Sequence, residues 1–100
     1  MNGTTEYLKI NLLEKYFGNT EEKLYREQFE SYKPKIKGFK DNHEGYKIGD
    51  VIEFIAGYND DILYTTEILG FDQDGDIYLL WDCYWFPIRL SDTKRKIRKV

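Results

Sequence analysis

The spacing of apolar residues changes at Gly49. Before that position apolar side chains recur every three or four residues, as on one face of a helix. Beyond it they alternate and include many β-branched and aromatic residues, which is typical of strands. Turn-forming residues divide this second part into five short strands, which predict a small closed or nearly closed barrel. The strands are expected over residues 51–57, 61–71, 76–82, 84–90 and 96–100.

The first third of the chain predicts two helices. Gly18 separates them, Thr20 is a suitable N-cap for the second, and Pro34 ends it. Because the connection is short, the two helices are expected to form an antiparallel hairpin. One compact domain is therefore expected, with a helical hairpin over 1–33, a connecting segment over 34–48 and the barrel over 49–100. The first helix is expected to present an apolar stripe of Leu8, Leu12, Leu13 and Tyr16.

Residues 47–90 resemble the opening strands of SH3-like and Tudor-like barrels. A Gly-Asp pair precedes the first strand, in "YKIGDVIEF", and an Asp-Gly turn precedes a strand that ends in Asp82, in "DQDGDIYLLWD". Between them lies an aromatic-x-small-x-apolar strand. The resemblance implies an α+β protein: an N-terminal helical hairpin followed by a five-stranded antiparallel SH3-like β-barrel. The alternating residues that carry it are Tyr64, Thr66, Ile68, Ile77, Leu79 and Trp81.

Aromatic residues make up 17% of the chain, and six of them lie in residues 70–90. In the strand over 76–82 Ile77, Leu79 and Trp81 face one way, and Tyr78 and Leu80 face the other. A barrel core needs only one apolar face, so the helices are expected to cover the second. The alternative is an exposed aromatic groove for a protein partner, or a methyl-lysine cage, because Tyr and Trp offer large rigid surfaces. Its rim would consist of Tyr58, Tyr64, Tyr84 and Trp85.

The turn "DQDGD" is the segment that most resembles a metal site. Its acids alternate as in a calcium loop, but the glycine and the final glutamate of such a loop are missing. A hairpin turn that uses the Asp-Gly preference for positive φ explains it better. Asp72, Asp74 and Asp76 are therefore candidates for partner binding, with no metal and no cofactor expected. A Cys–His enzyme is not expected, because acids next to Cys83 disfavour its thiolate and His43 is the sole histidine.

Charge is unevenly distributed along the chain, whose net charge is −3. Residues 50–92 contain ten acids and a single base, whereas residues 93–100 contain five bases and no acid. This basic tail is a candidate for contact with nucleic acid or with an acidic partner, including the protein's own acids. A low pI argues against nucleic acid as the principal ligand. The tail residues are Lys94, Arg95, Lys96, Arg98 and Lys99.

These patterns predict a small non-catalytic protein–protein interaction module. The partner is expected to be a protein, either a second copy of the chain or a basic host protein. Composition suggests a phage or mobile element, and hence a structural part or an acidic inhibitor of a host nucleic-acid enzyme, similar in size and charge to anti-CRISPR and anti-restriction proteins. The alternative is a nucleic-acid-binding adaptor that uses the basic tail. No apolar run is long enough to cross a membrane, so the expected location is the bacterial cytoplasm or a virion.

Overall fold

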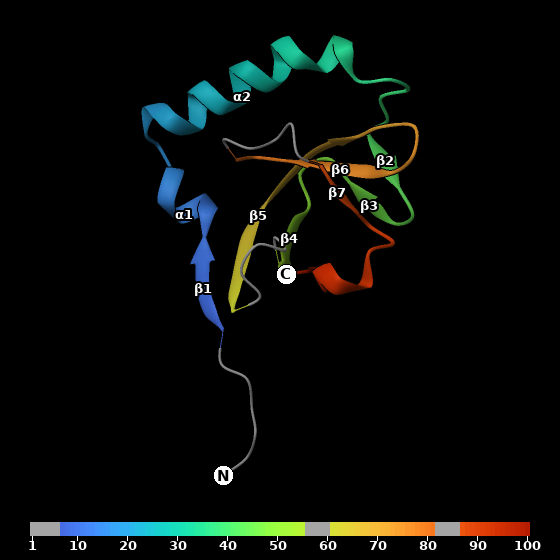
Figure 1. Ribbon diagram of the computed structural model, residues 1–100. Coiled ribbons are helices and arrows are strands. Elements are labelled where there is room, and N and C mark those ends of the chain that lie inside the picture. The colour runs from blue at the N-terminus through green and yellow to red at the C-terminus, as the bar shows by residue number, and fades with distance from the viewer. Residues whose placement is uncertain (1–6, 56–60, 82–86) are drawn as a thin grey trace.

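The computed structural model describes residues 7–55, 61–81 and 87–100 (Figure 1). Two helices and eight short strands follow one another in these residues, together with two 3-10 turns. The elements are β1 (Leu8–Asn11), α1 (Leu12–Tyr16), α2 (Thr20–Tyr32), η1 (Lys33–Lys35), β2 (Asn42–His43), β3 (Tyr46–Lys47), β4 (Val51–Phe54), β5 (Ile62–Phe71), β6 (Asp76–Leu79), β7 (Ile88–Arg89), η2 (Thr93–Arg95) and β8 (Arg98–Lys99).

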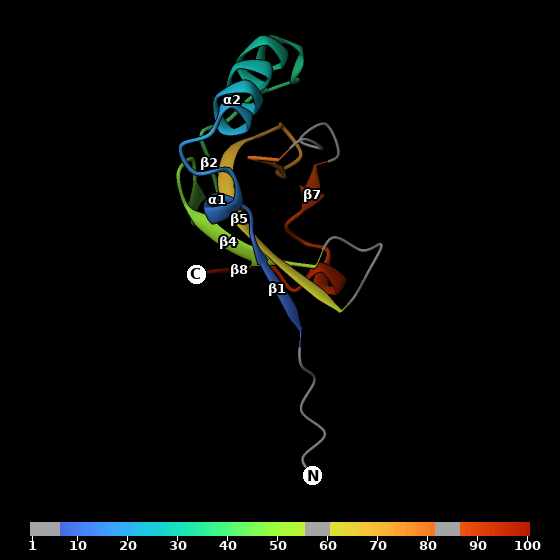
Figure 2. The ribbon, with the colours of Figure 1, turned by 90° about the vertical axis from the view of Figure 1, so that its left-hand side faces the viewer.

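A single curled sheet forms the centre of the molecule. Its strands run in the order β7-β6-β5-β4-β8, and all neighbours on this path are antiparallel. The first half of β5 pairs with β4 on one side and with β1, in parallel, on the other. Its second half pairs with β6, after a register shift between Ile68 and Gly70 that bends the strand. The sheet thereby curls into a half-barrel (Figures 1 and 2), which is compatible with a small β-barrel but less closed than predicted.

The predicted N-terminal helical hairpin is wrong. Where the first helix was expected, the chain forms β1 and then α1, a helix of only five residues. Asn11 explains the late start, because its side chain accepts hydrogen bonds from the N–H groups of Leu13 and Glu14 and so caps the helix there. Leu8 consequently lies on an exposed strand, away from the buried Leu12, and does not join the predicted stripe.

The second helix is the one long helix of the described residues. Asn19, one residue before the predicted cap, accepts hydrogen bonds from the N–H groups of Glu21 and Glu22. Pro34 does not end the helix abruptly, since α2 continues into η1 and the chain leaves the helical path at Ile36. The helix lies across the outer surface of the sheet (Figure 1) and does not pair with an antiparallel helix of similar length.

The segment predicted as a connection contains a small hairpin. Strands β2 and β3 pair antiparallel through a two-residue turn of Glu44 and Gly45. Both turn residues have positive φ, 48° and 87°, as a type I′ turn requires. The hairpin leads into β4, which begins at Val51.

Two apolar cores lie on opposite faces of the sheet. The first fills the half-barrel and includes Ile77 and Leu79 of β6. The second lies between the sheet and α2, and includes Tyr78 and Leu80 together with Phe29 of the helix. The predicted alternation of β6, with helical cover for its second apolar face, is thus confirmed. Thr66, a buried polar residue of β5, satisfies its hydroxyl by donating to the carbonyl oxygen of Leu80 at 2.8 Å.

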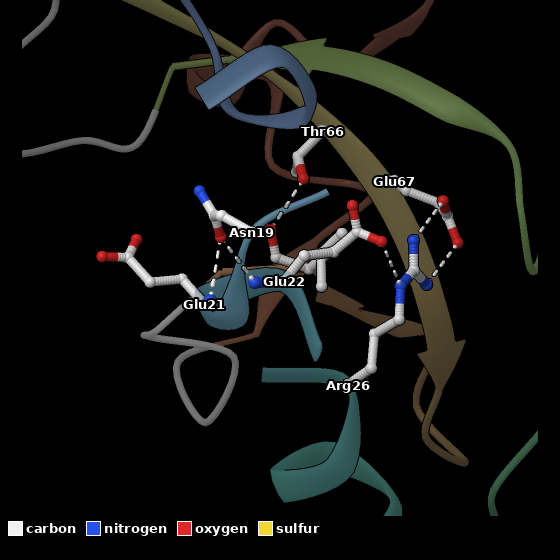
Figure 3. Close-up of polar contacts among 7 residues, drawn as sticks. Asn19, Glu21, Glu22, Arg26, Thr66 and Glu67 are labelled. Atoms are coloured by element: carbon white, nitrogen blue, oxygen red, sulfur yellow. Dashed lines mark hydrogen bonds and ion pairs between the residues drawn. The ribbon is translucent and has the colours of Figure 1, made fainter. Parts of the chain in front are cut away.

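An ion-pair network fixes α2 to β5 beside the second core (Figure 3). The guanidinium of Arg26 donates to both carboxylate oxygens of Glu67, each at 3.0 Å, and to Glu22 at 3.4 Å. The hydrogen bond to Glu67 is the main reason that the pKa of Arg26 rises above its ordinary value. Because all three side chains are partly exposed, the network contributes about 1 kcal/mol and mainly sets the rotation of the helix.

Candidate interaction surface

The acidic stretch, residues 50–92, is partly neutralised within the fold. Five of its ten carboxylates lie in ion pairs, so the negative charge is not one open surface. Apart from the shortest, Arg98 with Glu53, the pairs have N–O distances of 2.9 to 3.4 Å. The pairs are Arg26–Glu67, Arg89–Asp76, Arg95–Asp92, Arg98–Glu53 and Lys99–Asp50.

The basic tail lies against the protein itself. Lys94 is exposed, Arg95 lies 3.4 Å from Asp92, and Lys96 donates to the hydroxyl of Tyr7 at 3.3 Å. Arg98 and Lys99 form β8 and make the ion pairs described above. Four of the five tail bases therefore contact groups of the protein itself, and three of these contacts are with its own acids.

The ammonium of Lys99 is held by several groups at the start of β4. Its Nζ donates to the carbonyl oxygen of Gly45 at 2.7 Å, lies 3.4 Å from a carboxylate oxygen of Asp50, and stands 5.3 Å from the ring centre of Tyr46. The pKa of Asp50 is lowered, first by a hydrogen bond from the backbone N–H of Lys47 and also by Lys99. Three groups therefore attract the ammonium: the carboxylate of Asp50 by its charge, the carbonyl of Gly45 by its dipole, and the ring of Tyr46 by its face.

An open hollow adjoins this lysine contact. It has a volume of about 510 Å³ and mixed polar and apolar walls. Ile48, at its edge, is an apolar side chain that stays exposed. The hollow is lined by Asp41, Asn42, Gly45, Tyr46, Lys47 and Ile48.

The acidic turn is built by its own carboxylates. Asp72 Oδ1 accepts the N–H groups of Asp74 and Asp76, at 2.9 and 3.1 Å, while the carboxylate of Asp76 binds Arg89. Gly75 has φ +84°, so the predicted Asp-Gly turn is confirmed. Within residues 7–55, 61–81 and 87–100 no group of three or more His, Cys, Asp or Glu side chains could hold a metal ion.

His43 has a packing role beside that turn. Its ring lies so close to Gly75 that a Cβ at that position would come within 2.3 Å of Nε2. Its Nδ1 lies 3.1 Å from the ammonium of Lys40, which can only donate. The imidazole therefore seals the turn against the β2–β3 hairpin, and its predicted lack of a catalytic role remains a prediction because Cys83 lies outside the described residues.

The predicted aromatic rim is only partly within the described structure. Tyr64 is buried, with its ring centre 4.9 Å from that of Trp81, and so has little surface to offer a partner. Tyr58, Tyr84 and Trp85 lie outside the described residues. Tyr64 therefore serves the half-barrel core, where Phe54 also packs against Trp81.

Burial of Tyr78 predicts a loss of stability at high pH. Desolvation first, and then the negative charge of Asp72, raise the pKa of the Tyr78 hydroxyl from 10 to about 12. Because the folded protein keeps this proton more tightly than the unfolded chain does, the stabilisation is complete below pH 10 and is lost as pH rises through about 12. We expect a loss on the order of 2 kcal/mol, measured by urea unfolding between pH 9 and about 12. Tyr78→Phe should not show this loss of stability above pH 10. If its stability changed with pH as the wild type's does, the loss could not be assigned to Tyr78.

Three large apolar side chains in the first quarter of the chain remain exposed. Leu8 is 61% exposed, Phe17 82% and Leu24 47%. They belong to β1, to the residue after α1 and to α2. These elements lie on the side of the ribbon that faces the viewer in Figure 2. Sequence reasoning missed these exposed side chains, because helical spacing assigned Leu8 to a packed stripe with Leu12, Leu13 and Tyr16.

Comparisons with known proteins return no similarity. No family model, no curated protein and no solved structure matches the chain. None of the described helices combines the length and apolar character needed to cross a membrane.

Proposed function

We propose that the protein is a small non-catalytic protein–protein interaction module. The observation that carries the proposal is the exposure of Leu8, Phe17 and Leu24, which come from β1, the end of α1 and α2. Apolar side chains of this size in water favour burial against a partner, and each contributes about 1.5–3 kcal/mol when fully covered. The curled sheet serves as a rigid support for these elements.

The internal ion pairs favour a partner bound by apolar contact over one bound by negative charge. With five of the ten carboxylates of the acidic stretch already in ion pairs, mimicry of nucleic acid by negative charge has less support than apolar contact. A structural part that packs against a second copy or another protein therefore fits better than an acidic inhibitor. The SH3-like or Tudor-like relationship and a phage or mobile-element source belong to this proposal, and rest on the sequence pattern together with the half-barrel shape.

Replacing Phe17 by Ser tests the proposal. The side chain is exposed, so we expect unchanged urea unfolding but at least a tenfold weaker association, because an anchor is lost from the contact. Association is measured by sedimentation velocity for self-assembly, and by mass spectrometry of proteins captured from the source cell.

Glu27→Ser is the matched control, since this side chain on α2 is exposed and polar. It should leave association unchanged. The proposal fails if neither a self-contact nor a captured protein depends on Phe17.

A further inference from the structure

The outer edge of β4 carries an extended basic segment of the chain's own tail. β8 pairs antiparallel with β4, so that Lys99 stands opposite Ile52 and Arg98 opposite Glu53. The N–H of Val100 continues the ladder by donating to the carbonyl oxygen of Val51 at 3.0 Å. The edge therefore binds a strand through its backbone, as in recognition by strand addition.

The side chains on this edge differ in how firmly they are held. The carboxylate side chains are largely buried, with Glu53 13% and Asp50 17% exposed, whereas those of Arg98 and Lys99 are 73% and 50% exposed. Asp50 is also fixed by the backbone N–H of Lys47. The acids thus form a preorganised receptor, and the bases lie on it as a ligand would.

The segment before the basic pair adds a third element of recognition. Ile97 is partly buried and packs against the half-barrel core. The segment that fits the edge is therefore apolar–basic–basic, with the second base received by Gly45, Tyr46 and Asp50.

Attachment of the tail is weak enough for exchange. β8 has two residues, and ion pairs with exposed bases contribute little to stability. Lys96, just before the segment, adopts the left-handed conformation with φ 52°, which is unfavourable for a residue with a side chain and so disfavours the bound path. Upstream, the N–H of Ile55 binds the carbonyl oxygen of Arg95 and anchors the chain, so release is confined to the residues that follow.

A longer segment would gain surface that β8 does not cover. A strand continued past Val100 in the same direction would pass Asp50 and reach the hollow bordered by the exposed Ile48. A competing segment can therefore add apolar contact to the same charge and backbone interactions.

We propose that the outer edge of β4 and the β2–β3 hairpin form a binding site for an extended apolar–basic–basic segment of a protein partner. The chain's own residues 97–99 occupy this site until the partner displaces them. The site goes beyond the function proposed above, because it lies on the β4 edge of the sheet and does not involve the exposed side chains of Leu8, Phe17 and Leu24.

Binding of a labelled peptide to the full-length protein tests the site. The probe is a fluorescein-labelled TKRKIRKV, the sequence of residues 93–100. Fluorescence anisotropy should show at least tenfold tighter binding to R98S/K99S than to the wild type, because the competing tail loses its charges. In that background, adding D50N/E53Q should weaken binding at least tenfold.

Two controls separate the site from general charge attraction. E27Q/E30Q, made in the R98S/K99S background, removes two carboxylates from α2 and should leave the affinity unchanged. A peptide of the same composition with its apolar and basic residues in scrambled order should bind at least fivefold more weakly. Amide NMR shifts should move at Gly45, Tyr46 and Asp50.

Each contrary result is decisive. Equal affinity for the wild type and R98S/K99S, insensitivity to D50N/E53Q, or equal binding of the scrambled peptide would overturn the site. A wild-type dimer that disappears in D50N/E53Q would assign the site to the tail of a second copy in place of a separate partner. None of these results depends on Phe17, so the proposed function stands or fails independently.

Discussion

Replacing Phe29 by Ala should lower the free energy of unfolding by about 3–5 kcal/mol. Phe29 is the buried residue of α2, and its ring centre lies 6.3 Å from that of Phe39 and 6.1 Å from that of Tyr78. Truncation removes the apolar contact between helix and sheet and leaves a cavity that the rigid sheet cannot close. The Arg26–Glu67 bridge remains, but its contribution is too small to compensate.

Urea unfolding followed by circular dichroism measures this loss. Leu24→Ala is the matched control on the same helix, because Leu24 is exposed and should change stability by no more than about 0.5 kcal/mol. Phe29→Leu retains most of the side-chain volume and should lose about 1–2 kcal/mol, which keeps the series measurable if the alanine variant does not fold. A loss below about 1 kcal/mol for Phe29→Ala would mean that α2 is not held by this core.

Local patterns predicted where β4, β5, β6 and β8 lie, whereas of the strand expected over 84–90 the described residues show only β7. In β6 and the residue after it, Ile77 and Leu79 alternate with Tyr78 and Leu80 as strand geometry requires, and both faces are packed. The turn at Gly75 was predictable for a similar reason, since few residues other than glycine accept its φ. Such features depend on residues close in the sequence, so they can be predicted without knowing the fold.

The first helix was predicted wrongly because residues far away in the sequence determine the structure there. Leu8 has helical spacing to Leu12, but the backbone groups of residues 8–11 pair with β5, more than fifty residues away. Asn11 then starts α1 by accepting two backbone N–H groups. Neither the parallel pairing nor the competition between cap positions is encoded in the helical period.

The candidate surface was only partly predictable, because charge along a sequence does not show which charges meet. Arg98 and Lys99 were identified as contact residues, and the fold brings them to Glu53 and Asp50. Tyr46 was not identified, although its ring forms part of the lysine contact. A signal was present in the hairpin "NHEGYK", whose Gly45 permits the tight turn that presents this tyrosine.

Replacing Phe54 by Ala should also lower the free energy of unfolding by about 3–5 kcal/mol. Phe54 is fully buried in β4, with its ring centre 5.9 Å from that of Tyr64 and 6.2 Å from that of Trp81. Loss of this ring leaves a cavity in the half-barrel core, which lies on the other face of the sheet from the core that contains Phe29. Because β5 and β6 supply residues to both cores, we expect a single unfolding transition in which both cores are lost together.

Val51→Ala is the matched control for Phe54, since Val51 lies on the same strand but is only partly buried; it should lose about 1 kcal/mol or less. Both variants are measured by urea unfolding, monitored in parallel by far-ultraviolet circular dichroism and by tryptophan fluorescence. Two separate transitions, or a loss for Phe54→Ala no larger than that for Val51→Ala, would contradict the coupling of the cores. Coincident transitions, with a large loss for Phe54→Ala and a small one for Val51→Ala, are the expected result. They would show that packing in the half-barrel core stabilises β4, whose outer edge carries the basic segment.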